Sequence, residues 1–420
     1  MRFGTPRSAA LTRRSVAAGL AVMPAALAAA QLPAGEEIRT DIAVIGAGVF
    51  GSWIAWHLAR AGRGVVLVDA YGPANARASS GGESRVIRAD YGGDRLYSDW
   101  AARSLPVWQA LSQRHDMPLF HRTGVLWMTP QRDERTEASL ATLSQLGVRH
   151  ETLSREALAG RYPQIALDGI GFGLFEPDSG ALMARRAVQT VVAEAVAAGA
   201  RLVTDAAGAP VLHEHGVGIP LAQGGRIEAG HAVYACGPWL PQIFPDIVGQ
   251  RIRPTRQSVF YFGAPAGDRR FAPPAMPVWA DFNAGDIFYG LPDLESRGFK
   301  IAHDAHGPDI DPDTMERLPT AREVSEVRAY LARRFPALAD APLVESRVCQ
   351  YENTSSGDFL IDRHPQSGRV WLAGGGSGHG FKHGPMVGAY VAGQLLERDQ
   401  PVEPRFALAS KAIEAAREVY

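Results

Sequence analysis

The segment from Asp41 to Asp69, DIAVIGAGVFGSWIAWHLARAGRGVVLVD, predicts one βαβ unit that carries a dinucleotide site. Its apolar run at Ile42–Ile45 is typical of a buried parallel strand. In the glycine motif that follows, Gly46 permits a tight turn and Gly48 lets a pyrophosphate approach the backbone. Gly51 lets the next helix pack closely on the strand, and that helix presents its free N–H groups and positive dipole end to the phosphates.

A second strand at Val65–Val68 completes this unit and ends in an acid. Asp69 stands 18 residues after Gly51, where a carboxylate can accept hydrogen bonds from the ribose hydroxyls. A lone glycine motif would also fit a glycine-rich turn in another α/β protein. The strand, glycines, helix, second strand and acid together favour the dinucleotide site.

Composition limits the other classes of function. The length of 420 residues predicts two or three domains, and a net charge of −1 offers no basic surface for nucleic acid or an anionic membrane. Within the mature chain we find no apolar run of the roughly 20 residues that a membrane span needs. The histidines lack the ligand spacing of a metal site, so we expect no metal.

The first thirty residues predict a secretory signal peptide, followed by removal of residues 1–30. A positive head without acids precedes an apolar, alanine-rich stretch at Val16–Ala30, which offers A-x-A cleavage sites. The run Thr12-Arg13-Arg14-Ser15-Val16 is typical of the twin-arginine signal, which exports folded proteins. We therefore expect a periplasmic protein that meets the twin-arginine machinery, with an ordinary export signal as the alternative.

Glycine-rich strand ends near residues 237 and 375 indicate that the chain returns to the nucleotide-binding domain. We predict an α/β fold, α+β overall, with a Rossmann-like domain interleaved with a substrate domain built on a mixed β-sheet. The predicted Rossmann-like domain comprises 38–122, 176–249 and 349–398. The predicted substrate domain comprises 123–175 and 250–348, and a C-terminal helical tail covers 399–420.

Several further segments stand in a specific order along the chain: Glu83-Ser84-Arg85-Val86-Ile87-Arg88, Tyr289-Gly290-Leu291-Pro292, Gly298-Phe299-Lys300-Ile301, Val348-Cys349-Gln350-Tyr351, Ile361-Asp362-Arg363-His364-Pro365 and Ser377-Gly378-His379-Gly380-Phe381-Lys382. With the βαβ unit, they make the chain resemble the monomeric sarcosine oxidase and N-methyltryptophan oxidase group of D-amino-acid-oxidase-like flavoproteins. The resemblance covers nearly everything from Asp41 to Leu396.

This resemblance implies FAD as the cofactor and assigns roles to individual residues. Cys349 corresponds to the cysteine that links sulfur to the flavin, and Lys300 to the lysine that promotes oxygen reduction. The resemblance puts Arg85 and His379 beside the flavin as further catalytic residues. It implies that Arg88 and Lys382 hold the substrate carboxylate and that Tyr289 and Tyr351 are pocket aromatics. The third glycine segment supplies Gly375, Gly376 and Gly378 to the cofactor site.

Elementary chemistry agrees with these roles and leaves alternatives open. A partly buried carboxylate needs paired charge, which a bidentate Arg88 and the point charge of Lys382 can supply. Cys349 could instead be an inert buried cysteine or pair with Cys236, since a periplasmic disulfide is possible.

Two departures from the family bear on the substrate. Ser79-Ser80-Gly81-Gly82 stands where the family has histidines, and Asp304 stands where it has a histidine. His303 comes one residue earlier, and because strand side chains alternate, it would face away from Lys300 while Asp304 shares the Lys300 side. We therefore expect Asp304 in the substrate site and a substrate that is larger or more basic than sarcosine.

The predicted function is FAD-dependent oxidation of a secondary or N-substituted amino acid. Hydride passes to the flavin, the imine hydrolyses, and O₂ is reduced to H₂O₂. One alternative is an amino acid dehydrogenase of the same fold that passes electrons to a quinone or carrier. Another is an exported flavin- or ligand-binding protein without turnover. An NAD-dependent enzyme would leave Cys349 and the residue-375 glycines unexplained.

Overall fold

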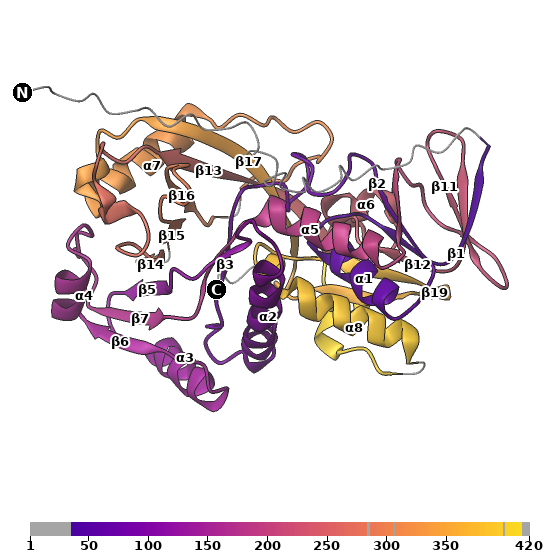
Figure 1. Cartoon of the computed structure of the whole chain (residues 1–420), viewed down its shortest axis with the longest axis horizontal. Helices are drawn as coiled ribbons and strands as arrows, with labels where there is room; N and C mark the ends of the chain where they lie inside the picture. Colours follow the sequence, from indigo (N-terminus) through magenta and orange to yellow (C-terminus); the bar gives the residue numbers. More distant parts are fainter. Residues whose placement is uncertain (1–34, 284–285, 306, 398–399, 414–420) are drawn as a thin grey trace, which may run out of the picture.

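The computed structural model of the chain describes residues 35–283, 286–305, 307–397 and 400–413. The predicted signal peptide lies outside the described residues. The described chain forms two large β-sheets and a small three-stranded sheet, with helices packed around them (Figure 1).

The first large sheet is built on the predicted βαβ unit. β1 (Glu37–Ile45) pairs in parallel with β2 and β12, β2 pairs with β9, and β12 also pairs with β19. β10 and β11 form a hairpin, and β11 pairs with β12 in the antiparallel direction, so the hairpin widens the sheet next to β12. β18 pairs with β19, also in the antiparallel direction. The other strands are β2 (Val65–Asp69), β9 (Arg201–Thr204), β10 (Val211–Leu212), β11 (Val217–Pro220), β12 (Arg226–Tyr234), β18 (Leu360–His364) and β19 (Ser367–Gly374).

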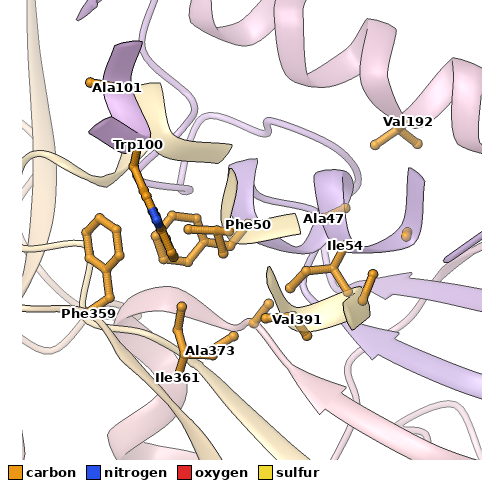
Figure 2. Close-up of a cluster of buried hydrophobic side chains, with 14 of the residues drawn as sticks. Ala47, Phe50, Ile54, Trp100, Ala101, Val192, Phe359, Ile361, Ala373 and Val391 are labelled. Atoms are coloured by element: carbon orange, nitrogen blue, oxygen red, sulfur yellow. The ribbon is translucent and has the colours of Figure 1, made fainter. Parts of the chain in front are cut away.

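Three helices pack together beside this sheet: α1 (Val49–Arg60), α5 (Ala184–Ala197) and α8 (Gly384–Leu396) (Figure 1). Their close approach depends on glycine. A Cβ at Gly51 would overlap the carbonyl oxygen of Gly46, and a Cβ at Gly388 of α8 would lie 2.7 Å from the backbone of Trp53 in α1. Figure 2 shows the apolar cluster that results, with residues from α1, the two C-terminal strands and α8: Phe50, Ile54, Ile361, Ala373 and Val391.

The second large sheet has the order β17-β13-β16-β15-β14-β5-β7-β6. Neighbouring strands are antiparallel except for the parallel pair β14–β5, so the sheet is mixed, as predicted. Its strands are β5 (Val125–Thr129), β6 (Glu151–Ser154), β7 (Phe172–Glu176), β13 (Ile252–Phe262), β14 (Val278–Asn283), β15 (Asp286–Leu291), β16 (Phe299–His303) and β17 (Leu343–Thr354).

Helix α7 (Ala321–Arg334) packs on the second sheet and is fixed to it by a buried ion pair. Thr320 caps the helix in a reciprocal capping box with Glu323. Arg334 Nε lies 2.9 Å from Asp281 Oδ2, and the Tyr330 hydroxyl donates to the same oxygen at 2.6 Å. The charges of this core pair are thus neutralised within the sheet–helix interface.

The small sheet, of order β3-β8-β4, links the two larger units. Its strands are β3 (Arg85–Ile87), β4 (Phe120–His121) and β8 (Gly180–Leu182). Helix α2 follows β3 and is capped by the Asp94 carboxylate, which accepts from the Tyr97 N–H. The remaining helices are α2 (Arg95–Gln113), α3 (Glu134–Gln145), α4 (Arg155–Arg161) and α6 (Leu240–Ile243).

The mixed α/β fold agrees with the sequence prediction, but some details differ. The predicted domain boundary at residue 349 falls inside β17, because this strand pairs with β13 as far as Thr354. Of the predicted helical tail, residues 400–413 contain only the short 3₁₀ turns Pro404–Phe406 and Leu408–Ser410. Pro401 and Pro404 lack the N–H groups that an α-helix there would need. Among the described residues, no helix has the length and apolar character to cross a membrane.

Candidate functional site

Two cavities adjoin where the two large sheets meet. The long cavity, of about 470 Å³, runs past the carboxyl ends of β1, β2 and β12. The small cavity, of about 100 Å³, is lined by residues of β3, β5, β14, β15 and β16 and by the segment after β19. Four residues line both cavities, so the two spaces share a wall: Arg85, Tyr351, Gly378 and Phe381.

The glycine motif of the βαβ unit forms one wall of the long cavity. Gly46 has φ +103°, and a Cβ there would overlap the Ala235 carbonyl oxygen, so this turn requires glycine. A Cβ at Gly48 would lie 3.6 Å from Ser80 Oγ, an ordinary contact. Protein packing therefore does not require glycine at position 48, and its backbone lines the cavity at the N-terminus of α1, where an anion is favoured.

Asp69 lines the long cavity at the end of β2. Its carboxylate accepts hydrogen bonds from the N–H groups of Ala47 at 2.8 Å and Tyr71 at 2.9 Å, which fix its position. Burial raises the pKa of this carboxyl group, and these hydrogen bonds partly offset the effect.

The C-terminal glycines divide into two roles. Gly376 and Gly378 line the long cavity, as predicted for cofactor-binding residues, whereas Gly375 does not. Gly375 has φ +68°, and a Cβ there would lie 2.5 Å from Thr354 Cγ2. It therefore makes the turn after β19 possible and does not itself face the cavity.

Glu352, which the sequence reading missed, is a further acid in the wall of the long cavity. Burial raises the pKa of this carboxyl group to about 7, against the opposing effect of the Gly376 and Gly375 N–H groups. Its Oε2 atom is buried without a hydrogen-bond partner among the described residues.

These features fit FAD, the cofactor that the family resemblance implies. The α1 N-terminus suits a diphosphate, and Asp69 suits a ribose. The far end of the long cavity reaches Arg85 and Tyr351, which also line the small cavity, so a flavin there would adjoin a bound substrate.

Lys300, Arg85 and Cys349 meet near the shared wall. Lys300 Nζ donates to the Ser84 carbonyl oxygen at 2.9 Å, and Arg85 Nη2 lies 3.5 Å from Cys349 Sγ. Burial, followed by the neighbouring Arg85 charge, lowers the pKa of Lys300 to about 7. The two cysteines, Cys236 and Cys349, are not joined by a disulfide.

Arg88 and Lys382 both line the small cavity and are both buried. The Arg88 guanidinium stacks between the rings of Tyr91 and Trp127, at 3.8 Å and 4.8 Å from their centres. Lys382 Nζ donates to the Tyr91 hydroxyl at 2.8 Å and to the His379 carbonyl oxygen at 2.9 Å. Burial and the charge of Arg88 place the pKa of Lys382 well below its usual value. The structure thus brings together the two cations that were predicted to bind a carboxylate.

Tyr289, Tyr351 and Asp304 complete the small cavity. Burial and the Asp304 carboxylate raise the pKa of Tyr289 to about 12. Asp304 lines this cavity together with Lys300, while His303 stacks on Phe288 with ring centres 4.4 Å apart. His303 at the end of β16 and Asp304 directly after it therefore lie on opposite sides, as the strand alternation predicts.

His379 also lines the small cavity, but both of its ring nitrogens are bound by protein. Nδ1 lies 3.1 Å from the Tyr91 hydroxyl, and Nε2 lies 2.9 Å from the Gly357 carbonyl oxygen. His379 thus supports Tyr91 through its ring and Lys382 through its backbone carbonyl, and its catalytic place beside the flavin stays a prediction.

Three other residues of the site were missed by the sequence reading. Glu176 is fully buried at the end of β7, where its carboxylate accepts from the Ala89 N–H and Trp127 Nε1. His383 is buried against the Tyr91 hydroxyl. Of the three, only Tyr91 could have been found from the sequence, because it lies three residues after Arg88. In the part of the chain that the structure describes, His, Cys, Asp and Glu side chains form no group of three that could bind a metal.

Comparisons with known proteins agree with this geometry. Monomeric sarcosine oxidase from Bacillus sp. (strain NS-129) is 30% identical over 361 residues, 84% of this chain and 92% of that protein. N-methyl-L-tryptophan oxidase from Salmonella arizonae is 30% identical over 368 residues, 86% of this chain and 96% of that protein.

Solved structures share the fold at lower identity. L-proline dehydrogenase from P. horikoshii superposes with a TM-score of 0.76 at 21% identity, covering 90% of this chain and 98% of that one. Glycine oxidase from Geobacillus kaustophilus gives 0.74 at 19% identity, covering 88% and 98%. The profile of the FAD dependent oxidoreductases matches residues 41–394, and the chain belongs to this family.

Proposed function

We propose that the protein oxidises a secondary or N-substituted amino acid at the small cavity and reduces O₂ to H₂O₂. The observation that carries this proposal is the placement of Arg88 and Lys382 together in a small, buried cavity that shares a wall with the long one. Sarcosine oxidase and N-methyl-L-tryptophan oxidase, the relatives at 30% identity, support it through the activities that their names state.

The residues of the small cavity act mainly by binding and orienting the substrate. Arg88 and Lys382 hold the carboxylate, while Tyr289 and Tyr351 provide flat walls with polar tips for the amine end. When FAD is bound, its flavin accepts the hydride from the substrate α-carbon. Asp304 is the one acid among the described lining residues of this cavity, so it favours a substrate with an additional positive or hydrogen-bond-donating group.

An aerobic screen of N-methyl and cyclic amino acids for peroxide release tests the activity, and Arg88→Ala tests the site. Loss of one partner of a buried charge pair costs about 2–5 kcal/mol, so kcat/KM should fall by roughly one and a half to four decades. The exposed Arg122→Ala is the matched control and should change little. Amines without a carboxylate should react poorly, and equal reaction of decarboxylated analogues would contradict the assignment.

Lys300 supports the choice of O₂ as acceptor. Negative charge develops on O₂ as it takes up electrons, and a fixed cation in a dry site stabilises that charge. The Lys300 pKa of about 7 also favours a second candidate, a dehydrogenase that uses a quinone or carrier, because a neutral Lys300 would not activate oxygen.

The pH dependence of reoxidation distinguishes these two candidates. The lysine is charged below its pKa, so reoxidation by O₂ should slow as the pH rises through that pKa. The pKa is about 7 in the empty cavity, and a bound anion raises it. Lys300→Met should reoxidise ~10²-fold more slowly and lose this dependence, whereas Lys300→Arg should stay fast at high pH. Stopped-flow measurement of both half-reactions checks this. Unchanged reoxidation in Lys300→Met would favour the dehydrogenase.

We further propose that Cys349 forms a thioether to the flavin: one S–C bond would replace the thiol S–H and a C–H bond of the flavin, two protons would leave, and the two electrons would pass to O₂, the acceptor of the proposed reaction. Its sulfur lies on β17 beside Arg85, a cation that stabilises negative charge on sulfur during attack, and Tyr351 of the same strand lines both cavities. Acid-precipitated protein should keep its yellow colour, and a denaturing gel should give a fluorescent band. Cys349→Ala should lose both signals while Cys236→Ala keeps them. Flavin released entirely into the supernatant by the parent protein would refute the linkage.

The same chain is proposed to reach the periplasm through the twin-arginine route, on the sequence of residues 1–30 alone. That route transports folded proteins and so suits a chain that acquires its cofactor in the cytoplasm. Cell fractionation of a variant with both Arg13→Lys and Arg14→Lys should find the periplasmic protein strongly reduced. An undiminished periplasmic fraction would instead point to the general export route.

A further inference from the structure

Tyr91 contacts both cations of the proposed carboxylate site. The Arg88 guanidinium lies 3.8 Å from the centre of its ring, and Lys382 Nζ donates to its hydroxyl at 2.8 Å. The side chain is only 3% exposed. One buried tyrosine therefore touches Arg88 through its ring face and Lys382 through its oxygen.

The neighbouring histidines determine how the hydrogen bonds at this hydroxyl run. The Gly357 carbonyl can only accept, so the His379 Nε2 atom, 2.9 Å away, carries a proton. In a neutral His379, Nδ1 then accepts the single Tyr91 proton at 3.1 Å. His383 Nε2 lies 2.7 Å from the same hydroxyl oxygen and must donate to it.

In this arrangement His383 carries its proton on Nε2 and donates it to Tyr91, and Nδ1 carries no proton. His383 Nδ1 is buried and has no hydrogen-bond partner among the described residues, in agreement with that tautomer. Burial and the adjacent Lys382 charge place the pKa of His383 well below its usual value, so the ring is neutral. With His379 neutral, the Tyr91 oxygen thus accepts from His383 and Lys382 and donates to His379.

We propose that Tyr91 and His383 are positioning residues for the carboxylate site: His383 holds the Tyr91 hydroxyl in the orientation that accepts from Lys382. In its charged form, which a bound carboxylate favours, Lys382 places two of its N–H groups on Tyr91 and the His379 carbonyl and keeps the third for a ligand in the small cavity. The ring of Tyr91 supports Arg88 at the same time. This inference rests on the proposed function, from which it takes the carboxylate ligand.

The test uses the holoenzyme and two probes, sodium benzoate and a substrate amino acid found in the peroxide screen. Benzoate binding is followed by its effect on the flavin absorption spectrum, and the amino acid by the rate of flavin reduction against concentration. Tyr91→Phe removes the hydroxyl and keeps the ring over which Arg88 lies. Tyr97→Phe is the matched control, because its buried hydroxyl accepts from the Phe359 N–H and does not bind Lys382.

We expect Tyr91→Phe to weaken benzoate and amino acid binding by about 10- to 100-fold, the effect of losing one hydrogen bond to a charged group. Binding of an amine without a carboxylate should stay within about threefold of the parent, which a general structural defect would not allow. His383→Leu should reproduce the loss because it removes the donor. His383→Gln, whose amide can donate, should restore most of the affinity.

The outcomes separate this inference from the function on which it rests. If Arg88→Ala weakens benzoate binding but Tyr91→Phe does not, the positioning role is refuted and the carboxylate site stands. If Arg88→Ala leaves benzoate binding unchanged, both fail. Equal losses for carboxylates and simple amines in Tyr91→Phe would also refute the inference. Should His383→Leu not fold, the comparison of Tyr91→Phe, Tyr97→Phe and His383→Gln still decides it.

Discussion

The cations around the small cavity are solvated mainly by carbonyl oxygens and aromatic rings, and this feature governs the chemistry of the site. Lys300 donates to the Ser84 carbonyl, Lys382 to that of His379, and Arg85 to those of Ser79 and Ser84. Such dipoles offset the desolvation of a buried charge without cancelling it. Asp304 is the one acid among the described lining residues, so a bound carboxylate would meet mainly cationic groups and would stabilise the charged forms of Lys300 and Lys382.

The two faces of the second sheet differ in how their buried charged side chains are paired. Towards α7, Arg334 meets Asp281, and the pair is nearly inaccessible to solvent, with exposures of 0% and 1%. Towards the small cavity, Lys300 donates instead to the carbonyl and hydroxyl oxygens of Ser84. Strand alternation separates these two environments. The face towards α7 thus holds a neutralised ion pair, whereas the face towards the cavity holds a lysine with which a bound anion could pair.

The parts of this site that could be predicted from sequence are those set by local geometry. Gly46 and Gly51 stand in a local motif that is typical of a βαβ turn, and the opposite sides of His303 and Asp304 follow from the strand period. Glu176 and His383 could not be found in this way, because their partners at Ala89 and Tyr91 are 87 and 292 residues distant. The sequence alone does not distinguish Gly375 from Gly376 and Gly378. Only the structure shows that Gly375 packs against Thr354, while the other two line the long cavity.

Electrostatics also couples the two ends of the site. Burial and Arg85 lower the pKa of Lys300 to about 7, so this lysine gains or loses its proton near neutral pH. Any anion in the small cavity opposes the effect of Arg85 and raises the proton affinity of Lys300, since both line that cavity. A bound carboxylate therefore favours the charged form of Lys300, and the empty cavity favours the neutral form. If Lys300 acts on oxygen as proposed, the rate of reoxidation therefore depends on whether the cavity is occupied.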